Sequence, residues 1–206
     1  MNLETINQES NDLWFGDDGN NTHALNYPLN ENSTVVDLGG YHGKWATSII
    51  DKYNPYMVLV EPIPQFYELL KSKFANNPKV TVLNYGVSSE NTNGFLFLNG
   101  DGTSMHLERG NKIPVEFITI ELLLDKIGKK QVELIQINIE GEEFNLLDNM
   151  MKTGLVRRFN NLQIQFHTYI DDAINKRSNI QHMFVENGFE KLYDYPFVFE
   201  GWSLRN

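Results

Sequence analysis

The feature that most constrains the fold is an apolar run that ends in a glycine-rich turn. The run is Val35-Val36-Asp37-Leu38, and the turn is Gly39-Gly40-Tyr41-His42-Gly43. β-Branched and aliphatic residues are typical of a buried strand, and glycines allow the sharp turn from a strand into a helix. Apolar residues at every fourth position then predict a helix over 44–53. Strand, turn and helix are the first unit of an α/β fold, with a ligand seated on the turn.

Asp37 narrows the choice of ligand. The glycines alone fit NAD, FAD, a nucleotide or S-adenosylmethionine, or an ordinary turn without a ligand. In the pattern Asp-x-Gly-Gly-x-x-Gly, the carboxylate would repel a pyrophosphate, whereas it suits the cationic ammonium and sulfonium groups of S-adenosylmethionine. We therefore expect S-adenosylmethionine as the cofactor. The cofactor-binding residues expected in this segment are Asp37, Gly39, Gly40, Tyr41 and Gly43.

Further polar residues follow the next predicted strands. The run 56–60 is continuously apolar, as in a strand buried on both faces of a parallel sheet, and it ends at Glu61. An acid there is placed to accept the two ribose hydroxyls of an adenosine, in NAD and S-adenosylmethionine alike. Gly86 and Asn138 follow later strands. Because the carboxyl ends of parallel strands form the ligand crevice, both are also candidates for cofactor binding.

Predicted strands and helices alternate through most of the remaining chain. The strands expected are 79–83, 133–137 and 162–166, and a hairpin is expected over 189–199. A helix is expected to begin at Pro64, a second to span 120–127, a third to carry its apolar stripe over 144–151, and a fourth to include 180–184. This order predicts an α/β three-layer sandwich of the Rossmann-like class I methyltransferase type, with a mostly parallel sheet and a C-terminal antiparallel hairpin. Acids in the first turn of a helix suit its dipole, and we assign Glu142 and Glu143 to that role.

The alternation is interrupted between residues 88 and 118. Two short strands, 95–98 and 115–118, are expected on either side of a polar loop. Loops inserted at a ligand crevice often carry substrate contacts. Ser104, His106 and Arg109 are therefore the candidate substrate-binding residues, and a solvent-exposed loop is the alternative.

The length and composition of the chain limit which domains, binding partners and cellular location are expected. The 206 residues suit one domain, 34–206, preceded by a polar N-terminal segment, 1–33, that packs its aromatic residues on the domain. A net charge of −10, with no Lys/Arg run longer than two, disfavours nucleic acid as a partner. The absence of cysteine excludes disulfides, thiolate zinc sites and cysteine nucleophiles. No signal peptide or long apolar stretch is present, so we expect no membrane insertion and a cytoplasmic protein.

Four motifs, in this order, resemble the FkbM family of S-adenosylmethionine-dependent O-methyltransferases. They are Val-Val-Asp-Leu-Gly-Gly-Tyr-His-Gly-Lys-Trp (35–45), Val-Glu-Pro-Ile-Pro (60–64), Gln-Ile-Asn-Ile-Glu-Gly-Glu-Glu-Phe (136–144) and Gln-Phe-His (165–167). The resemblance implies a class I methyltransferase fold with seven strands, and methylation of a hydroxyl, often on a sugar or polyketide. The family usually has Asp where this chain has Asn138.

The expected chemistry is in-line attack of a hydroxyl on the methyl carbon. A placed general base must remove the hydroxyl proton, and we assign this role to His167, with Glu140 either orienting it or holding a second hydroxyl. Oxygen ligands near His167 also suit Mg²⁺ or Mn²⁺, so a metal is left open. The expected acceptor is a sugar, nucleotide-linked, in surface polysaccharide or natural-product biosynthesis, and a homo-oligomer is left open. The alternatives are a non-catalytic protein that binds S-adenosylmethionine or a partner, and a nicotinamide oxidoreductase.

Overall fold

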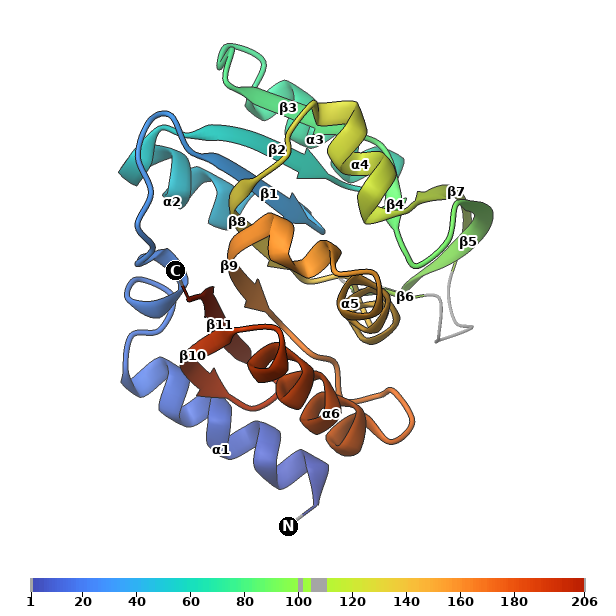
Figure 1. The fold of residues 1–206 in the computed structure, drawn as a ribbon. Helices are drawn as coiled ribbons and strands as arrows, with labels where there is room; N and C mark the ends of the chain where they lie inside the picture. The colour runs from blue at the N-terminus through green and yellow to red at the C-terminus, as the bar shows by residue number, and fades with distance from the viewer. Residues whose placement is uncertain (1, 100–101, 105–110, 206) are drawn as a thin grey trace.

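The structure is a computed structural model that describes residues 2–99, 102–104 and 111–205 (Figure 1). Its main sheet has seven strands in the order β10-β11-β9-β8-β1-β2-β3. The strands are β1 (Thr34–Leu38), β2 (Tyr56–Val60), β3 (Val80–Leu83), β8 (Val132–Ile137), β9 (Phe159–Ile164), β10 (Phe189–Tyr195) and β11 (Phe199–Leu204). Strand β11 is antiparallel to both of its neighbours, and all other pairs are parallel. The predicted fold class is confirmed.

Helices cover both faces of this sheet (Figure 1). They are α2 (Lys44–Tyr53) and α3 (Pro64–Lys73) on one face, and α4 (Ile120–Ile127), α5 (Glu143–Lys152) and α6 (Ala173–Glu186) on the other. Successive residues of a strand point to opposite faces, so Val35 packs with α2 and α3 while Val36 packs with α4, α5 and α6. Continuous apolar runs are thus what a sheet covered on both faces requires.

The segment in which the sequence predicts an interruption of the strand–helix alternation forms a second sheet. Its order is β4-β7-β5-β6, with β4 (Gly86–Val87), β5 (Thr92–Asn99), β6 (Gly102–Ser104) and β7 (Asn111–Ile118). Strands β5 and β7 pair antiparallel and are longer than the expected 95–98 and 115–118. The first half of β7 is exposed or half-buried, and its buried residues lie in the second half, so a search for apolar runs finds only its end.

The N-terminal segment lies against the C-terminal hairpin. Helix α1 (Leu3–Gly16) runs beside β10 (Figure 1). Trp14 is 1% exposed, and its ring lies 5.1 Å from that of Tyr195 and 5.2 Å from that of Phe199. Its neighbours Leu13 and Phe15 are exposed. Of the apolar group 13–15, only Trp14 therefore packs on the domain. A 3-10 turn, η1 (His23–Leu25), then leads toward β1.

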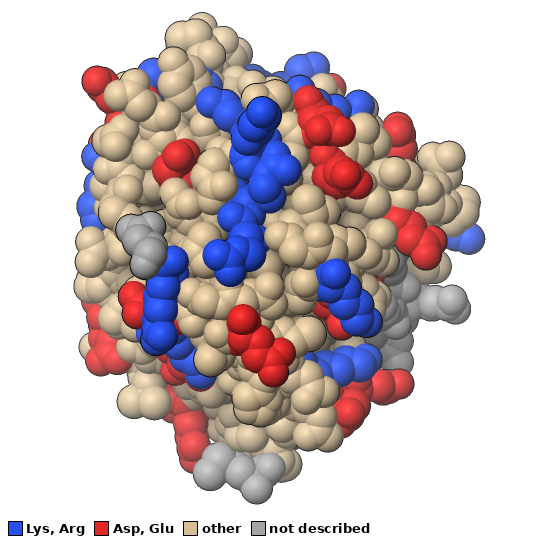
Figure 2. Space-filling model, in the orientation of Figure 1, with Lys and Arg blue, Asp and Glu red and all other residues tan. Residues whose placement is uncertain are grey.

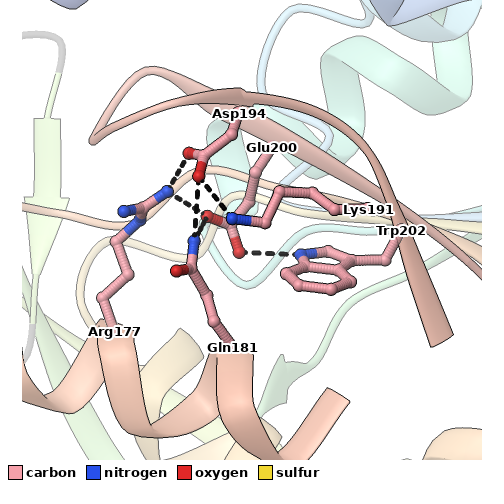
Figure 3. Close-up of polar contacts among 6 residues, drawn as sticks. All are labelled: Arg177, Gln181, Lys191, Asp194, Glu200 and Trp202. Atoms are coloured by element: carbon pink, nitrogen blue, oxygen red, sulfur yellow. Dashed lines mark hydrogen bonds and ion pairs between the residues drawn. The ribbon is translucent and has the colours of Figure 1, made fainter. Parts of the chain in front are cut away.

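A buried charged cluster joins α6 to the same hairpin (Figure 3). The guanidinium group of Arg177 pairs with both Asp194 and Glu200. Glu200 also accepts hydrogen bonds from Gln181 Nε2 at 2.8 Å and from Trp202 Nε1 at 2.8 Å. Burial raises the pKa of Glu200, and the charge of Arg177 opposes that rise. The cluster fixes the hairpin on α6 through ionic contacts that only the folded chain assembles.

Candidate active site

A pocket of about 510 Å³, including space open to solvent, lies at the carboxyl ends of β1, β2 and β8. Five predicted site residues line it: Gly39, Glu61, Gly86, Asn138 and Glu140. Leu96 of β5 and Phe117 of β7 complete the wall from the second sheet, so the inserted strands cover the pocket. The sequence pattern did not single out these two apolar residues. Their position follows from the pairing of β4 with β7 beside the crevice.

The glycine turn between β1 and α2 has a steric explanation at each glycine. Gly39 has φ +89°, and a Cβ there would lie 2.0 Å from the backbone oxygen of Asn138. A Cβ on Gly40 or Gly43 would lie 2.9 Å or 2.8 Å from a methyl group of Leu70 in α3. Gly40 and Gly43 are not among the residues that line the pocket. Their lack of a side chain serves the packing of α3, and a direct ligand contact there stays a prediction.

Glu61 is held rigidly at the pocket wall. Its Oε2 accepts the amide hydrogen of Tyr41 at 2.9 Å, and its Oε1 accepts that of Ile63 at 2.8 Å. Burial raises the pKa of Glu61 to about 7, backbone hydrogen bonds oppose this rise, and the charge of Glu140 adds to it. Each carboxylate oxygen keeps a further lone pair, so Glu61 can accept hydrogen bonds from a ligand without releasing the turn.

Two buried oxygens beside the pocket have no hydrogen-bond partner among the described residues: Asp37 Oδ1 and Asn138 Oδ1. Asp37 is 1% exposed, and its backbone neighbours Leu38 and Gly39 line the pocket. Burial, with a smaller contribution from the charge of Glu61, raises the pKa of Asp37 to about 7. Buried acceptors are almost always satisfied in folded proteins. A cationic or hydrogen-donating ligand group, such as the ammonium and sulfonium of S-adenosylmethionine, fits these two oxygens.

His167 is brought between two glutamates. Its Nδ1 lies 2.6 Å from Glu143 Oε1, and its Nε2 lies 3.6 Å from Glu140 Oε2. Tyr169 donates its hydroxyl hydrogen to the same Glu140 oxygen at 3.1 Å. Burial of the ring lowers the pKa of His167, but the hydrogen bond and charge of Glu143, with the charge of Glu140, outweigh this, so the pKa is raised. The structure thus brings together the two predicted catalytic residues.

Glu142 and Glu143 make contacts that the sequence did not reveal. Glu142 stands at the N-cap of α5 but makes no capping bond with its side chain, which instead binds the Ser88 hydroxyl at 2.6 Å and Asn145 Nδ2 at 3.1 Å. Glu143 is completely buried and faces His167. The cluster of acids after a strand was visible in the sequence. Which acid faces inward depends on the turn at 140–141, whose positive φ values no pattern gives.

The predicted substrate contacts are only partly within the described residues. Ser104 lies on β6, with its backbone paired to Phe97 of β5, and nothing is described of its side chain. His106 and Arg109 lie outside the described residues. Across the described ranges, no group of three or more His, Asp or Glu side chains is arranged to hold a metal ion. The option of Mg²⁺ or Mn²⁺ at Asn138, Glu140 and His167, which the sequence left open, therefore finds no support among the described residues.

Basic side chains gather away from this pocket. Figure 2 shows a run of Lys and Arg on the face seen in Figure 1. Lys129, Lys130 and Arg158 line a groove before the first residues of β8 and β9, which is the opposite edge of the sheet. Arg158 donates hydrogen bonds to the carbonyls of Lys129 and Lys130, so its guanidinium stabilises the fold.

Among the helices of the described ranges, none combines the length and the apolar character that a membrane span requires.

Solved structures share this fold at very low sequence identity. Fibrillarin from Methanococcus jannaschii, a pre-rRNA processing protein, matches with a TM-score of 0.55 and 12% identity over 87% of this chain and 70% of that one. Fibrillarin from Aeropyrum pernix, solved with natively bound S-adenosyl-L-methionine, matches with a TM-score of 0.52 and 10% identity. The match covers 85% of this chain and 68% of that one. A METTL16 methyltransferase domain matches with 0.51 and 8% over 84% of this chain, which spans only 61% of that domain. At these identities the likeness shows the fold alone.

The sequence comparison places the chain in a family. No curated protein matches it at a significant level. The profile of the methyltransferase FkbM domain matches residues 37–194, which include Asp37, Glu61, Glu140 and His167. This match covers most of the chain and agrees with the methyltransferase fold of the seven-stranded sheet. The chain belongs to the FkbM methyltransferase domain family.

Proposed function

We propose that the chain is an S-adenosylmethionine-dependent O-methyltransferase whose acceptor is a hydroxyl of a sugar, nucleotide-linked, in surface polysaccharide or natural-product biosynthesis. The observation that carries the proposal is the pair of buried oxygens of Asp37 and Asn138 that find no partner in the described part of the chain, beside a pocket that also presents Glu61. An anionic wall with unsatisfied acceptors suits a cationic donor. Family membership supports methyl transfer.

Residues in and beside the pocket are assigned to different parts of the cofactor. When bound, S-adenosylmethionine supplies a methyl group on a cationic sulfur. Asp37 faces the cationic end, and Glu61 accepts hydrogen bonds from the ribose hydroxyls. Leu96 and Phe117 provide apolar cover that excludes water from one side of the pocket. Holding two reactants in line supplies about 7–11 kcal/mol of a barrier, so placement is the main contribution of this wall.

His167 acts as the general base in this proposal. The proton of the acceptor hydroxyl moves to the imidazole, and Glu140 lies across the ring where it can orient the same hydroxyl. A placed base contributes about 10²–10⁴-fold to a rate. Ser104, His106 and Arg109 are proposed to contact the acceptor, with Arg109 suited to a diphosphate.

A screen of the purified full chain tests the activity. The chain is incubated with S-adenosylmethionine and a set of nucleotide sugars, and mass spectrometry detects an acceptor in which a methyl group replaces a hydrogen. Calorimetry with S-adenosylhomocysteine measures cofactor affinity in parallel. Tight binding without methyl transfer to any hydroxyl would favour a binding protein. Binding of NAD(H) without binding of S-adenosylhomocysteine would favour an oxidoreductase.

With an acceptor in hand, His167→Asn tests the base. We expect turnover to fall by about 10²–10⁴-fold while affinity for S-adenosylhomocysteine is unchanged, because the ring takes the proton and does not hold the cofactor. His182→Asn is the matched control, since this histidine is exposed on α6. Near-normal turnover of His167→Asn would remove the residue from its role.

A further inference from the structure

Glu143 is a buried acid that the reaction proposed above does not use. It is the first residue of α5 and is 0% exposed. Its Oε1 accepts the backbone amide hydrogen of His167 at 2.8 Å, and its Oε2 accepts that of Gly141 at 2.8 Å. Backbone amides only donate, so both carboxyl oxygens of Glu143 act as acceptors and hold the side chain in one orientation.

The same carboxylate determines which nitrogen of His167 carries the proton. Nδ1 lies 2.6 Å from Glu143 Oε1, which also accepts the backbone amide hydrogen of His167. An ionised carboxylate can only accept, and a neutral imidazole carries one proton, so a hydrogen bond between them places the proton on Nδ1 and leaves the lone pair on Nε2. Nε2 is the nitrogen on the side of Glu140, which lines the cofactor pocket.

We propose that Glu143 is a positioning residue that holds His167 as the Nδ1–H tautomer and thereby makes Nε2 the atom that takes the acceptor's proton. This inference rests on the proposed function for the acceptor, although the tautomer itself is a property of the protein alone. The proton leaves the hydroxyl oxygen for Nε2 as that oxygen bonds to the methyl carbon. The carbon–sulfur bonding pair stays on sulfur, and the imidazolium then releases its proton to water.

The backbone around Glu143 supports this role. Glu140 has φ +57° and Gly141 has φ +101°, a left-handed pair that is unfavourable at a residue with a side chain. The bond from the Gly141 amide to Glu143 Oε2 ties this turn down. One carboxylate therefore fixes the ring through Oε1 and, through Oε2, the turn that brings Glu140 to the other side of the ring. Strain of this kind is typical of functional sites.

The charges around the ring predict how the base titrates. Glu143 faces the ring from α5, Glu140 from the loop after β8, and Tyr169 from the loop after β9. Both acids favour the imidazolium, and together they outweigh the opposing effect of burial, so the pKa of His167 is raised. The acidic limb of the pH–rate profile is therefore expected above the ordinary range of histidine.

Nitrogen NMR of the full chain labelled with ¹⁵N-histidine tests the proposal directly. The signals of His167 are identified by their loss in His167→Asn. Above the pKa of the ring, we expect Nδ1 to give the shift of a protonated nitrogen and Nε2 that of an unprotonated one. The reverse assignment, or an equal mixture of tautomers, overturns the proposal. Because this readout needs no acceptor, it is independent of whether the methyl-transfer proposal succeeds.

Glu143→Gln tests the link to catalysis. Loss of the charge should lower the pKa of His167 and move the acidic limb of kcat/KM to lower pH, while kcat falls about tenfold or more and cofactor affinity holds. Glu121→Gln is the control, because Glu121 is the corresponding first-turn acid of α4 and is exposed. If Glu143→Gln does not fold, Glu143→Asp, which shortens the acid and keeps its charge, should lower kcat without that shift of the acidic limb. An unchanged His167 pKa in a folded Glu143→Gln protein contradicts the inference.

Discussion

The buried carboxylate of Asp37 has opposite effects on ligand binding and on the stability of the folded chain. One of its oxygens has no hydrogen-bond partner within the ranges that the structure describes, and burial with the nearby charge of Glu61 raises its pKa from 3.8 to about 7. A folded-state pKa above the unfolded value means that the folded chain binds more protons between these two pH values. The contribution of Asp37 to stability is therefore fully present below pH 3.8 and is lost as the pH rises through about 7. A bound cation reverses this loss by favouring the ionised form.

Asp37→Asn should separate the two effects. We expect the cofactor-free variant to melt at a higher temperature than the wild type at pH 8, with a much smaller difference at pH 5, because the buried charge is removed. Its affinity for S-adenosylmethionine should fall by about 1.5–3 kcal/mol, the usual value of a hydrogen bond to a charged group. Thermal melts at both pH values and calorimetry measure these quantities. Asp51→Asn, at an exposed site on α2, is the control, and a variant destabilised at pH 8 would contradict the account.

Individual site residues differed in how visible they were in the sequence. Asp37 and Glu61 were predictable, because an acid directly after an apolar run lies at the carboxyl end of a strand. The ligand contacts expected at Gly40 and Gly43 stay predictions, and their close packing against Leu70, 30 and 27 residues along the chain, was not visible in the sequence. Glu143 was not recognised, because its partner His167 is 24 residues away and its inward direction depends on the left-handed turn at Glu140.

At the scale of elements, the C-terminal hairpin depends on the charged cluster with α6 (Figure 3). Arg177→Met should destabilise the chain by about 3–5 kcal/mol, because it leaves the carboxylate of Glu200 buried without its cation. The double variant Arg177→Met with Glu200→Gln should recover part of this loss. Lys191→Met is the control at the exposed rim and should cost less than about 1 kcal/mol. Urea unfolding measures each value, and equal losses for Arg177 and Lys191 would refute the assignment.

Elements with a continuous or helical apolar pattern were predicted well. Strand β2 was expected over 56–60 and is Tyr56–Val60, and α4 was expected over 120–127 and is Ile120–Ile127. The second sheet was only half visible, because the first half of β7 is exposed or half-buried and the pairing of β5 with β7 is a tertiary contact.

At the scale of the whole molecule, α1 packs on the hairpin through one tryptophan. Trp14→Ala should cost about 3–5 kcal/mol in the free energy of unfolding, because the ring is buried among Tyr195, Phe199 and Tyr193. Phe15→Ala should change the stability by less than about 0.5 kcal/mol, since Phe15 is 68% exposed. Chemical denaturation of both variants makes the comparison. A similar loss for both would show that α1 does not pack as described.

The strand order makes one edge of the sheet depend on strand β11. Strand β10 comes before β11 along the chain, yet β11 lies between β10 and β9 in the sheet. Strand β9 therefore has an unpaired edge until β11 is in place, and β10 joins the sheet only through β11. An unpaired strand edge is a template for pairing with another chain, so any state in which residues 199–204 are detached exposes a site for aggregation.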